Sequence, residues 1–248
     1  MCVFASLPAL LMRSPSLYRD FACTLGALLV LLVWEWAGQD MAMAAWFGTP
    51  AGFAMHNTVW FDAVFHRWPH DMAWLLLFSF FAQMRWPIKA FQQIPAANIA
   101  WGVGATLWAL LLIQLMKHYS PTSCPWDLRE FGGSAQHLPH WRAFLLRWQD
   151  GGGGHCFPAG SASSGFAFIA AYPFLRGHAP RLARQWLVGF GLAGLLLGLA
   201  QQMRGAHFMS HTLWTAWLCW TCGMVLFWLR QTLIQRSRVL AGTPLART

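Results

Sequence analysis

The chain has 248 residues, of which 57% are hydrophobic and only 10% are charged. Soluble domains usually carry about 25% charged residues, so the composition excludes an ordinary soluble globular protein and indicates a membrane protein. The formal net charge of +9 does not indicate nucleic-acid binding, because the basic residues are scattered rather than gathered into a run.

A helix needs roughly 20 mostly apolar residues to cross the hydrocarbon core of a bilayer. The charges in the first 20 residues follow a short apolar run, unlike those of a secretory signal, so we expect this segment to be cytoplasmic or interfacial. The stretches that qualify as transmembrane helices are 21–37, 72–84, 97–116, 159–175, 186–200 and 207–228. The predicted fold is therefore all-α, a single membrane domain (1–248) built as a six-transmembrane-helix bundle.

The basic residues indicate which way the bundle faces. With the N-terminus in the cytoplasm, the cytoplasmic segments hold Arg13, Arg19, Arg85, Lys89, Arg176, Arg181, Arg184, Arg230, Arg236, Arg238 and Arg247. The outer segments hold Arg67, Lys117, Arg129, Arg142, Arg147 and Arg204. This asymmetry fits the positive-inside rule. We therefore expect a multi-pass protein of a bacterial inner membrane with both termini in the cytoplasm.

Two predicted outer loops, 38–71 and 117–158, are long. The first carries aromatic and aliphatic residues at helical spacing, which predicts a short interfacial amphipathic helix. These residues are Trp60, Phe61, Val64, Phe65 and Trp68. The second loop is rich in Gly, His and Pro, and its glycine run at 151–154 indicates local flexibility.

Cys124 and Cys156 both fall in the second outer loop. If that side is a periplasm, a disulfide between them is one expectation, and two free thiols are the other. Cys219 and Cys222 form a C-x-x-C inside an apolar helix, where packing is the expected role. No spacing typical of zinc ligands occurs, and we expect no metal and no cofactor.

Three polar segments lie at the outer ends of predicted helices, where polar residues are costly and tend to mark function. They are 117–127, 156–165 and 204–211. In the third segment Arg204, His207 and His211 follow i, i+3, i+7 spacing and share one helix face. A guanidinium binds phosphate well, and a histidine can act as nucleophile or base. The alternative is a snorkelling arginine beside core histidines, but three such residues on one face favour a functional site.

The second segment places Pro158, Ala159, Gly160 and Ser161 before a helix rich in small residues. Free N–H groups at a helix N-terminus form an anion site. Capping by Ser161 or Ser163 together with small-residue helix packing is the alternative, and the two are compatible.

In order and spacing these segments resemble the motifs of the type 2 phosphatidic-acid phosphatase family of membrane phosphatases, over roughly residues 70–228. The family's first motif is Lys, six residues, then Arg-Pro, and here Lys117 is followed after six residues by Cys124-Pro125. The second motif is Pro-Ser-Gly-His, and residues 158–161 match it with Ser161 in place of the His. The third ends in His, three residues, Asp, and here His207 is followed by His211.

The resemblance implies a reaction through a phosphohistidine on the outer side of the membrane. By position it implies that His207 is the nucleophile and His211 its orienting partner. Lys117 and Arg204 would hold the phosphate, since the family arginine falls on Gln201. Gly160 would lie at the phosphate, and Arg129 would replace the missing arginine of the first motif.

Ser161 stands where the family has its acid, and a serine hydroxyl is a poor general acid near neutral pH. It is an engineered replacement, or the mark of a binder that has lost catalysis, or a sign that the leaving group needs little protonation, as with a diphosphate. Another histidine is a further source of the proton. The candidates are His118, His137, His140 and His155.

The predicted function is hydrolysis or transfer of the phosphate of a lipid phosphate or polyprenyl diphosphate, with the bilayer and the lipid as partners and no nucleic acid. The second hypothesis is a lipid-phosphate binding or transport component without catalysis. The third, suggested by ten histidines and many aromatic residues, is a haem- or quinone-associated membrane protein. The third is disfavoured, because His207 and His211 lie on one helix and bis-His ligation usually draws on facing helices.

Overall fold

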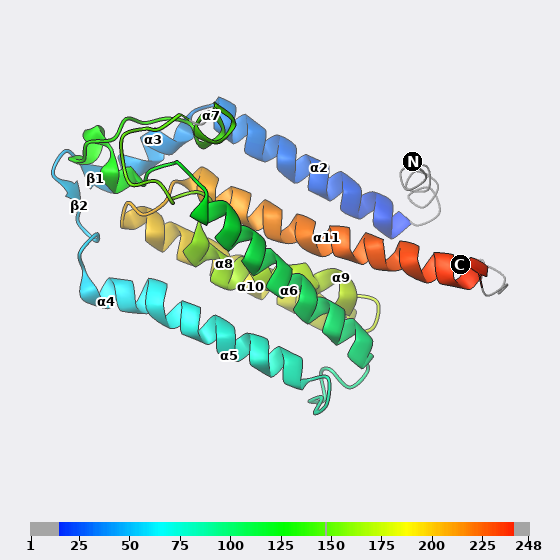
Figure 1. The fold of residues 1–248 in the computed structure, drawn as a ribbon. Coiled ribbons are helices and arrows are strands. Elements are labelled where there is room, and N and C mark those ends of the chain that lie inside the picture. The colour runs from blue at the N-terminus through cyan, green and yellow to red at the C-terminus, as the bar shows by residue number, and fades with distance from the viewer. Residues whose placement is uncertain (1–14, 147, 241–248) are drawn as a thin grey trace.

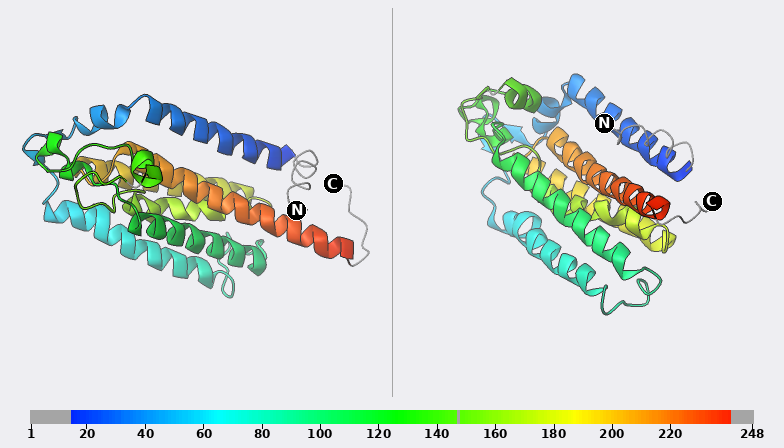
Figure 2. Two further views of the ribbon diagram at one scale, coloured as in Figure 1. Left: turned by 45° about the horizontal axis from the view of Figure 1, so that its top comes forward. Right: turned by 45° about the vertical axis from the view of Figure 1, so that its right-hand side comes forward.

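The computed structural model describes residues 15–146 and 148–240, and these are mostly helical. Predictions that concern Arg13, Arg147, Arg247 and the rest of the N-terminal segment before Pro15 lie outside the described residues. The helices run side by side along one direction, with both ends of the described chain at the same end of the bundle (Figures 1 and 2).

Four helices of the described chain are long and apolar enough to cross a membrane. They are α2 (Pro15–Trp36), α6 (Ala96–His118), α10 (Pro180–Met203) and α11 (Met209–Leu240). They correspond to the first, third, fifth and sixth predicted spans. α6 and α10 extend beyond their spans at both ends, α2 begins earlier but ends at Trp36, and α11 begins at Met209, two residues after the predicted start, and extends further at its other end. Many of their aliphatic side chains are exposed, as expected for helices in contact with lipid.

The fourth predicted span, 159–175, is divided into three short helical pieces. They are α8 (Gly160–Phe166), the 3₁₀ segment η4 (Ala167–Ala171) and α9 (Tyr172–Leu175). Almost every residue of this run is buried among α6, α10 and α11, so the run forms the centre of the bundle.

The second predicted span, 72–84, lies in a longer helical run. That run consists of α4 (Val59–Asp62), the π-helical segment η1 (Ala63–Arg67) and α5 (Trp68–Ala82). The predicted helical structure near Trp60 is therefore present, but it is not a short helix of its own, since these residues are the first turns of the run that continues into α5.

Pro69 gives a physical reason for the π segment. Proline has no N–H, so it cannot donate to the carbonyl four residues earlier, which belongs to Phe65. A π-helical stretch changes the hydrogen-bond register and lets the helix continue past this position, and such stretches often occur at functional sites.

The remaining elements form a cap at the end of the bundle opposite the two ends of the described chain (Figure 1). They are α3 (Gln39–Ala44), β1 (Gly48–Thr49), β2 (Gly52–Phe53), η2 (Pro125–Asp127), η3 (Arg129–Phe131) and α7 (His140–Leu146). The two strands pair antiparallel, with Gly48 opposite Phe53 and Thr49 opposite Gly52. Phe53, Phe131 and Phe208 pack in a small apolar core that joins this cap to the start of α11.

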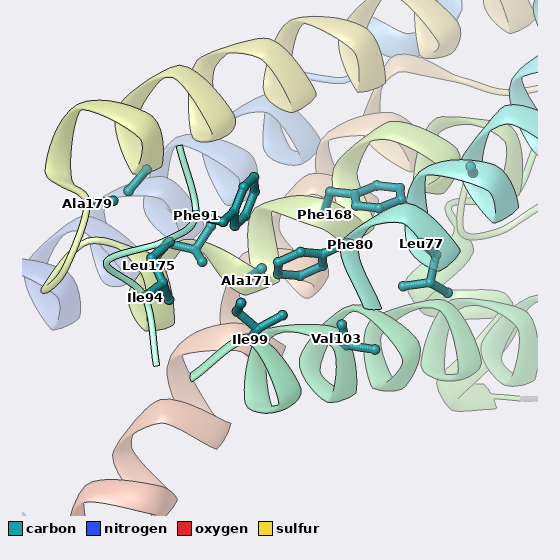
Figure 3. Close-up of a cluster of buried hydrophobic side chains, with 12 residues drawn as sticks. Leu77, Phe80, Phe91, Ile94, Ile99, Val103, Phe168, Ala171, Leu175 and Ala179 are labelled. Atoms are coloured by element: carbon teal, nitrogen blue, oxygen red, sulfur yellow. The ribbon is translucent and has the colours of Figure 1, made fainter. Parts of the chain in front are cut away.

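The main cores lie between the helices. One cluster joins α5, α6, η4–α9 and the start of α10, with Phe80, Phe168 and Ile99 at its centre (Figure 3). A second cluster joins α6, α8, η4 and α11. Close approach of backbones depends on glycine: a Cβ on Gly165 of α8 would lie 2.4 Å from the backbone nitrogen of Gly194 on α10. Small residues at helix contacts are the usual means of such packing in membranes.

Replacement of Gly194 by alanine should destabilise the bundle, because the new Cβ would lie 2.4 Å from Cδ1 of Phe166. Overpacking of this kind costs about 1–3 kcal/mol. We expect a lower midpoint of thermal unfolding in detergent, measured by tryptophan fluorescence. Gly191→Ala on the same helix is the matched control, because a Cβ there meets nothing within 4 Å. Equal midpoints for the two variants would contradict this packing.

Candidate functional site

The three polar segments meet at the capped end of the bundle and are hydrogen-bonded to one another through their backbones. The Cys156 amide donates to the Thr122 carbonyl at 2.9 Å, which joins the second segment to the first. The Trp126 amide donates to the Gly205 carbonyl at 3.0 Å, which joins the first to the third. Residues that are far apart in the sequence are thereby held in one place.

A disulfide between Cys124 and Cys156 further joins the first two segments, with a Cα–Cα distance of 5.1 Å. A covalent link of this kind limits how far the two segments can separate. The carbonyl group of Cys156 is itself part of the site, as the contact with His207 shows.

His207 is buried, and its Nδ1 lies 2.8 Å from the carbonyl oxygen of Cys156. A carbonyl oxygen can only accept, so Nδ1 carries the proton and Nε2 holds the free lone pair. Burial, together with the nearby positive charge of Lys117, holds the pKa of His207 well below its ordinary value. The ring is therefore neutral near pH 7, with its Nε2 free of a proton.

Lys117 reaches from the end of α6 over the start of α8. Its Nζ lies 3.3 Å from the position that a Cβ on Gly160 would occupy, so a larger residue there would displace the ammonium group by a few tenths of an ångström. No carboxylate of the described residues lies within ion-pair distance of Lys117. The ammonium group is thus placed beside the N-terminus of α8 and within electrostatic reach of His207.

Arg204 follows the end of α10, and its side chain is held by two others. One guanidinium nitrogen (Nη1) lies 2.7 Å from Oδ1 of Asp62 and donates to Oε1 of Gln201 at 3.2 Å. Gln201 is fully buried and donates through Nε2 to the Phe65 carbonyl at 2.9 Å. This is the carbonyl that Pro69 leaves without its α-helical donor. Gln201 therefore connects Arg204 to the π-helical segment η1.

His66 was not among the histidines that the sequence indicated, yet it contacts the site. It lies in η1, and its Nδ1 is 2.7 Å from Oγ of Ser161. The imidazole is otherwise exposed. Partial burial lowers the pKa of His66. The negative charge of Asp62 opposes this shift, and the positive charges of Arg204 and Lys117 add to it. The sequence does contain a feature that could have indicated His66: it is a polar residue among aromatic residues, three positions before Pro69.

His211 does not orient His207 as the resemblance implied. The two ring centroids are 6.0 Å apart, and the Cys156 carbonyl occupies Nδ1 of His207 instead. His211 packs edge-on against Phe157 and His140, with centroids 5.3 and 5.6 Å away. Its Nδ1 has no hydrogen-bond partner among the described residues. The prediction that Arg204, His207 and His211 share one helix face is wrong, because α10 ends at Met203 and α11 begins at Met209, which leaves Arg204 and His207 in the turn between them. His211 lies in the first turn of α11, and its side chain points into an aromatic cluster.

Arg129 also does not join the site. Its side chain is exposed, and Nε donates to the Ser134 carbonyl at 3.0 Å within its own loop. Ser163 donates to the Gly160 carbonyl at 2.6 Å, a local contact within α8.

The other histidines in the outer segments differ in their placement. His140 is buried with Nε2 3.4 Å from Glu35, and burial lowers its pKa to about 3. His155 is exposed, with Nδ1 3.3 Å from the Lys117 carbonyl. No hydrogen bond joins either of them to Ser161 within the described chain. Groups of three or more His, Cys, Asp or Glu residues suited to a metal ion do not occur in residues 15–146 and 148–240.

No family model, curated protein or solved structure matches this chain.

Asp62 is expected to compete with any anion that binds at Arg204, because its carboxylate holds the guanidinium at 2.7 Å. Asp62→Asn should therefore bind inorganic phosphate or vanadate more tightly, by roughly 3- to 10-fold, a range set by the strength of charge-assisted contacts. Isothermal titration calorimetry in detergent measures this. Asp71→Asn is the control, because Asp71 is exposed and its ion-pair partner is His70. Unchanged affinity in Asp62→Asn would show that anions do not use Arg204.

Proposed function

We propose that this chain is a membrane phosphatase or phosphotransferase that acts on a lipid phosphate or polyprenyl diphosphate through a phosphohistidine. One observation carries the proposal: a buried neutral histidine, His207, has its Nδ1 proton held by a carbonyl and lies within electrostatic reach of Lys117. A fixed tautomer with a free Nε2 is what a nucleophilic imidazole needs, and a nearby cation favours the charge that develops on a phosphoryl group.

In the proposed reaction, Nε2 of His207 attacks phosphorus and forms a P–N bond. The P–O bond to the lipid breaks, and the leaving oxygen takes up a proton. Lys117, Arg204 and the N-terminal amides of α8 stabilise the phosphoryl oxygens. Water, or an acceptor alcohol, then attacks phosphorus, breaks the P–N bond and releases phosphate or a new phosphate ester.

His66 supplies the missing general acid in this proposal. Its contact with Ser161 at 2.7 Å brings an imidazole to the position at which the family has its own histidine. Protonated His66 donates to the leaving oxygen, either directly or through the Ser161 hydroxyl, which can accept one proton while donating another. Neutral His66 is then available to take the proton from the attacking water.

The proposal also concerns how the chain lies in the membrane. We propose that the second and fourth predicted spans, 72–84 and 159–175, lie within the bilayer as the two remaining members of a six-helix bundle, and that His66 lies outside them. The run 160–175 is buried among other helices and needs no long lipid-facing surface. The candidate site then faces the periplasm of a bacterial inner membrane, since the predicted cytoplasmic basic residues lie at the opposite end.

Substitution of His207 by alanine should lower phosphate release by about 10³-fold or more, because the attacking atom is lost. Release is measured from a panel of lipid monophosphates and diphosphates in detergent that contains EDTA. His70→Ala is the control, as this histidine is exposed on α5. Acid-labile radiolabel on the protein after brief exposure to ³²P-labelled substrate would identify the phosphohistidine. Saturable lipid binding without turnover by the unchanged chain would instead favour a non-catalytic binder.

His66→Gln should lower turnover by about 10²–10⁴-fold, the usual contribution of a general acid. Ser161→His in the His66→Gln background should restore part of the activity, since it returns an imidazole to the same position. A general acid must be protonated, and the pKa of His66 is lowered, so kcat/KM should fall as the pH rises from about 5 to 8. His207 stays neutral over this range, so its titration does not lower kcat/KM at the acidic end of the profile. A flat profile, or full activity in His66→Gln, would rule out this role.

A further inference from the structure

A cavity lies at the other end of the bundle, between the start of α6, the end of α9 and the second half of α11. Its volume is about 350 Å³, and its walls include Asn98, Arg176, His178, Phe227, Arg230 and Ile234. This is the end at which the described chain begins and ends (Figure 1). The cavity shares no residue with the candidate phosphatase site.

The charge of Arg176 is already compensated. Its guanidinium forms a two-pronged contact with the buried carboxylate of Asp20 on α2, with one N–O distance of 2.6 Å. It also lies over the rings of Tyr172 and Phe227, 5.5 and 5.4 Å from their centroids. Arg176 therefore forms a fixed wall of the cavity and contributes little net charge.

Arg230 is different, because its charge has no acidic partner. Nη2 donates to Oδ1 of Asn98 at 2.9 Å, and Asn98 is fixed in turn by donation from Nδ2 to the Phe174 carbonyl at 2.9 Å. No carboxylate of the described residues lies within ion-pair distance of Arg230. A half-buried guanidinium held in place by a neutral amide is suited to bind an anion, and guanidinium groups favour phosphate oxygens.

The place of the cavity indicates where that anion comes from. The cavity lies between α6 and α11, two helices that are long and apolar enough to cross a membrane, so membrane lipid is the nearest source. Phe227 and Ile234 line the cavity on the same face of α11 as Arg230 and offer apolar contacts to the lipid beside its headgroup. At 350 Å³ the cavity is near the lower limit for small-molecule pockets, which suits a headgroup rather than a whole lipid.

We infer that this cavity binds the phosphate group of an anionic phospholipid, with Arg230 as the counter-ion and with Phe227 and Ile234 as apolar contacts beside the headgroup. Basic pockets between transmembrane helices commonly bind anionic headgroups at the cytoplasmic surface. The inference is independent of hydrolysis at the other end, because it uses different residues and requires no reaction.

Native mass spectrometry of the full chain, titrated with phosphatidylglycerol or with phosphatidylcholine of the same acyl chains, tests this inference. All proteins carry Lys117→Gln, which removes a cation from the candidate phosphatase site. We expect one phosphatidylglycerol to bind about tenfold more tightly than phosphatidylcholine, as for a charge-assisted hydrogen bond. Arg230→Gln should abolish this preference. Gln231→Glu should abolish it as well, because it places a negative charge beside an unchanged Arg230.

Arg236→Gln is the matched control, since it removes the same charge from an exposed position on the same helix. It should keep the full preference for phosphatidylglycerol. An equal loss in Arg236→Gln would show diffuse surface attraction and overturn the inference, as would a preference that survives in Arg230→Gln. Inorganic phosphate is tested alone: Arg230-dependent binding of phosphate without any preference between the two lipids would assign the cavity to a free anion and overturn the lipid assignment.

Discussion

The hydrogen bond from Gln201 to the Phe65 carbonyl is the contact on which the arrangement of the candidate site depends. Pro69 cannot donate to that carbonyl, so the helical run adopts a π-helical stretch and presents the oxygen to the buried amide of Gln201 at 2.9 Å. The same turns then bring Asp62 to Arg204 and His66 to Ser161. A proline inside a helix usually disrupts it, but here Pro69 fixes how the helical run 59–82 approaches the turn between α10 and α11.

The centre of the bundle provides the rigid support for this end. The segmented run α8–η4–α9 is buried on nearly all sides. Gly165 in this run lets α10 approach to backbone distance, and Gly223 of α11 lets α11 approach the backbone of Ala170 in the same way. Gly160 begins this run and leaves the space in which the Lys117 ammonium lies. Helix packing and the placement of the proposed phosphate site therefore depend on the same requirement for small residues.

The sequence predicted the features that depend on local pattern. Long apolar stretches predicted four helices that are long and apolar enough to span a membrane, and polar residues at helix ends predicted that Lys117, Ser161 and His207 gather at one end. The contact between His66 and Ser161 joins residues 95 positions apart, and no local periodicity encodes it. The roles implied for His211 and Arg129 came from motif positions alone. Their side-chain directions depend on an aromatic cluster and on a loop carbonyl, which spacing does not reveal.

Each of the two proposed anion sites contains a partly buried cation that no described acidic side chain pairs with. Taking a cation out of water is costly unless a partner compensates it. Arg176 and Arg204 have carboxylate partners, Asp20 and Asp62, whereas the other arginines with described side chains, apart from Arg230, are exposed. Among the described side chains this leaves Lys117 and Arg230 as the partly buried cations without an acidic partner. They lie at opposite ends of the bundle, one beside the N-terminus of α8 and the other in a cavity lined by Phe227 and Ile234. A phosphate group that reaches either position supplies the compensating charge that the chain itself does not provide.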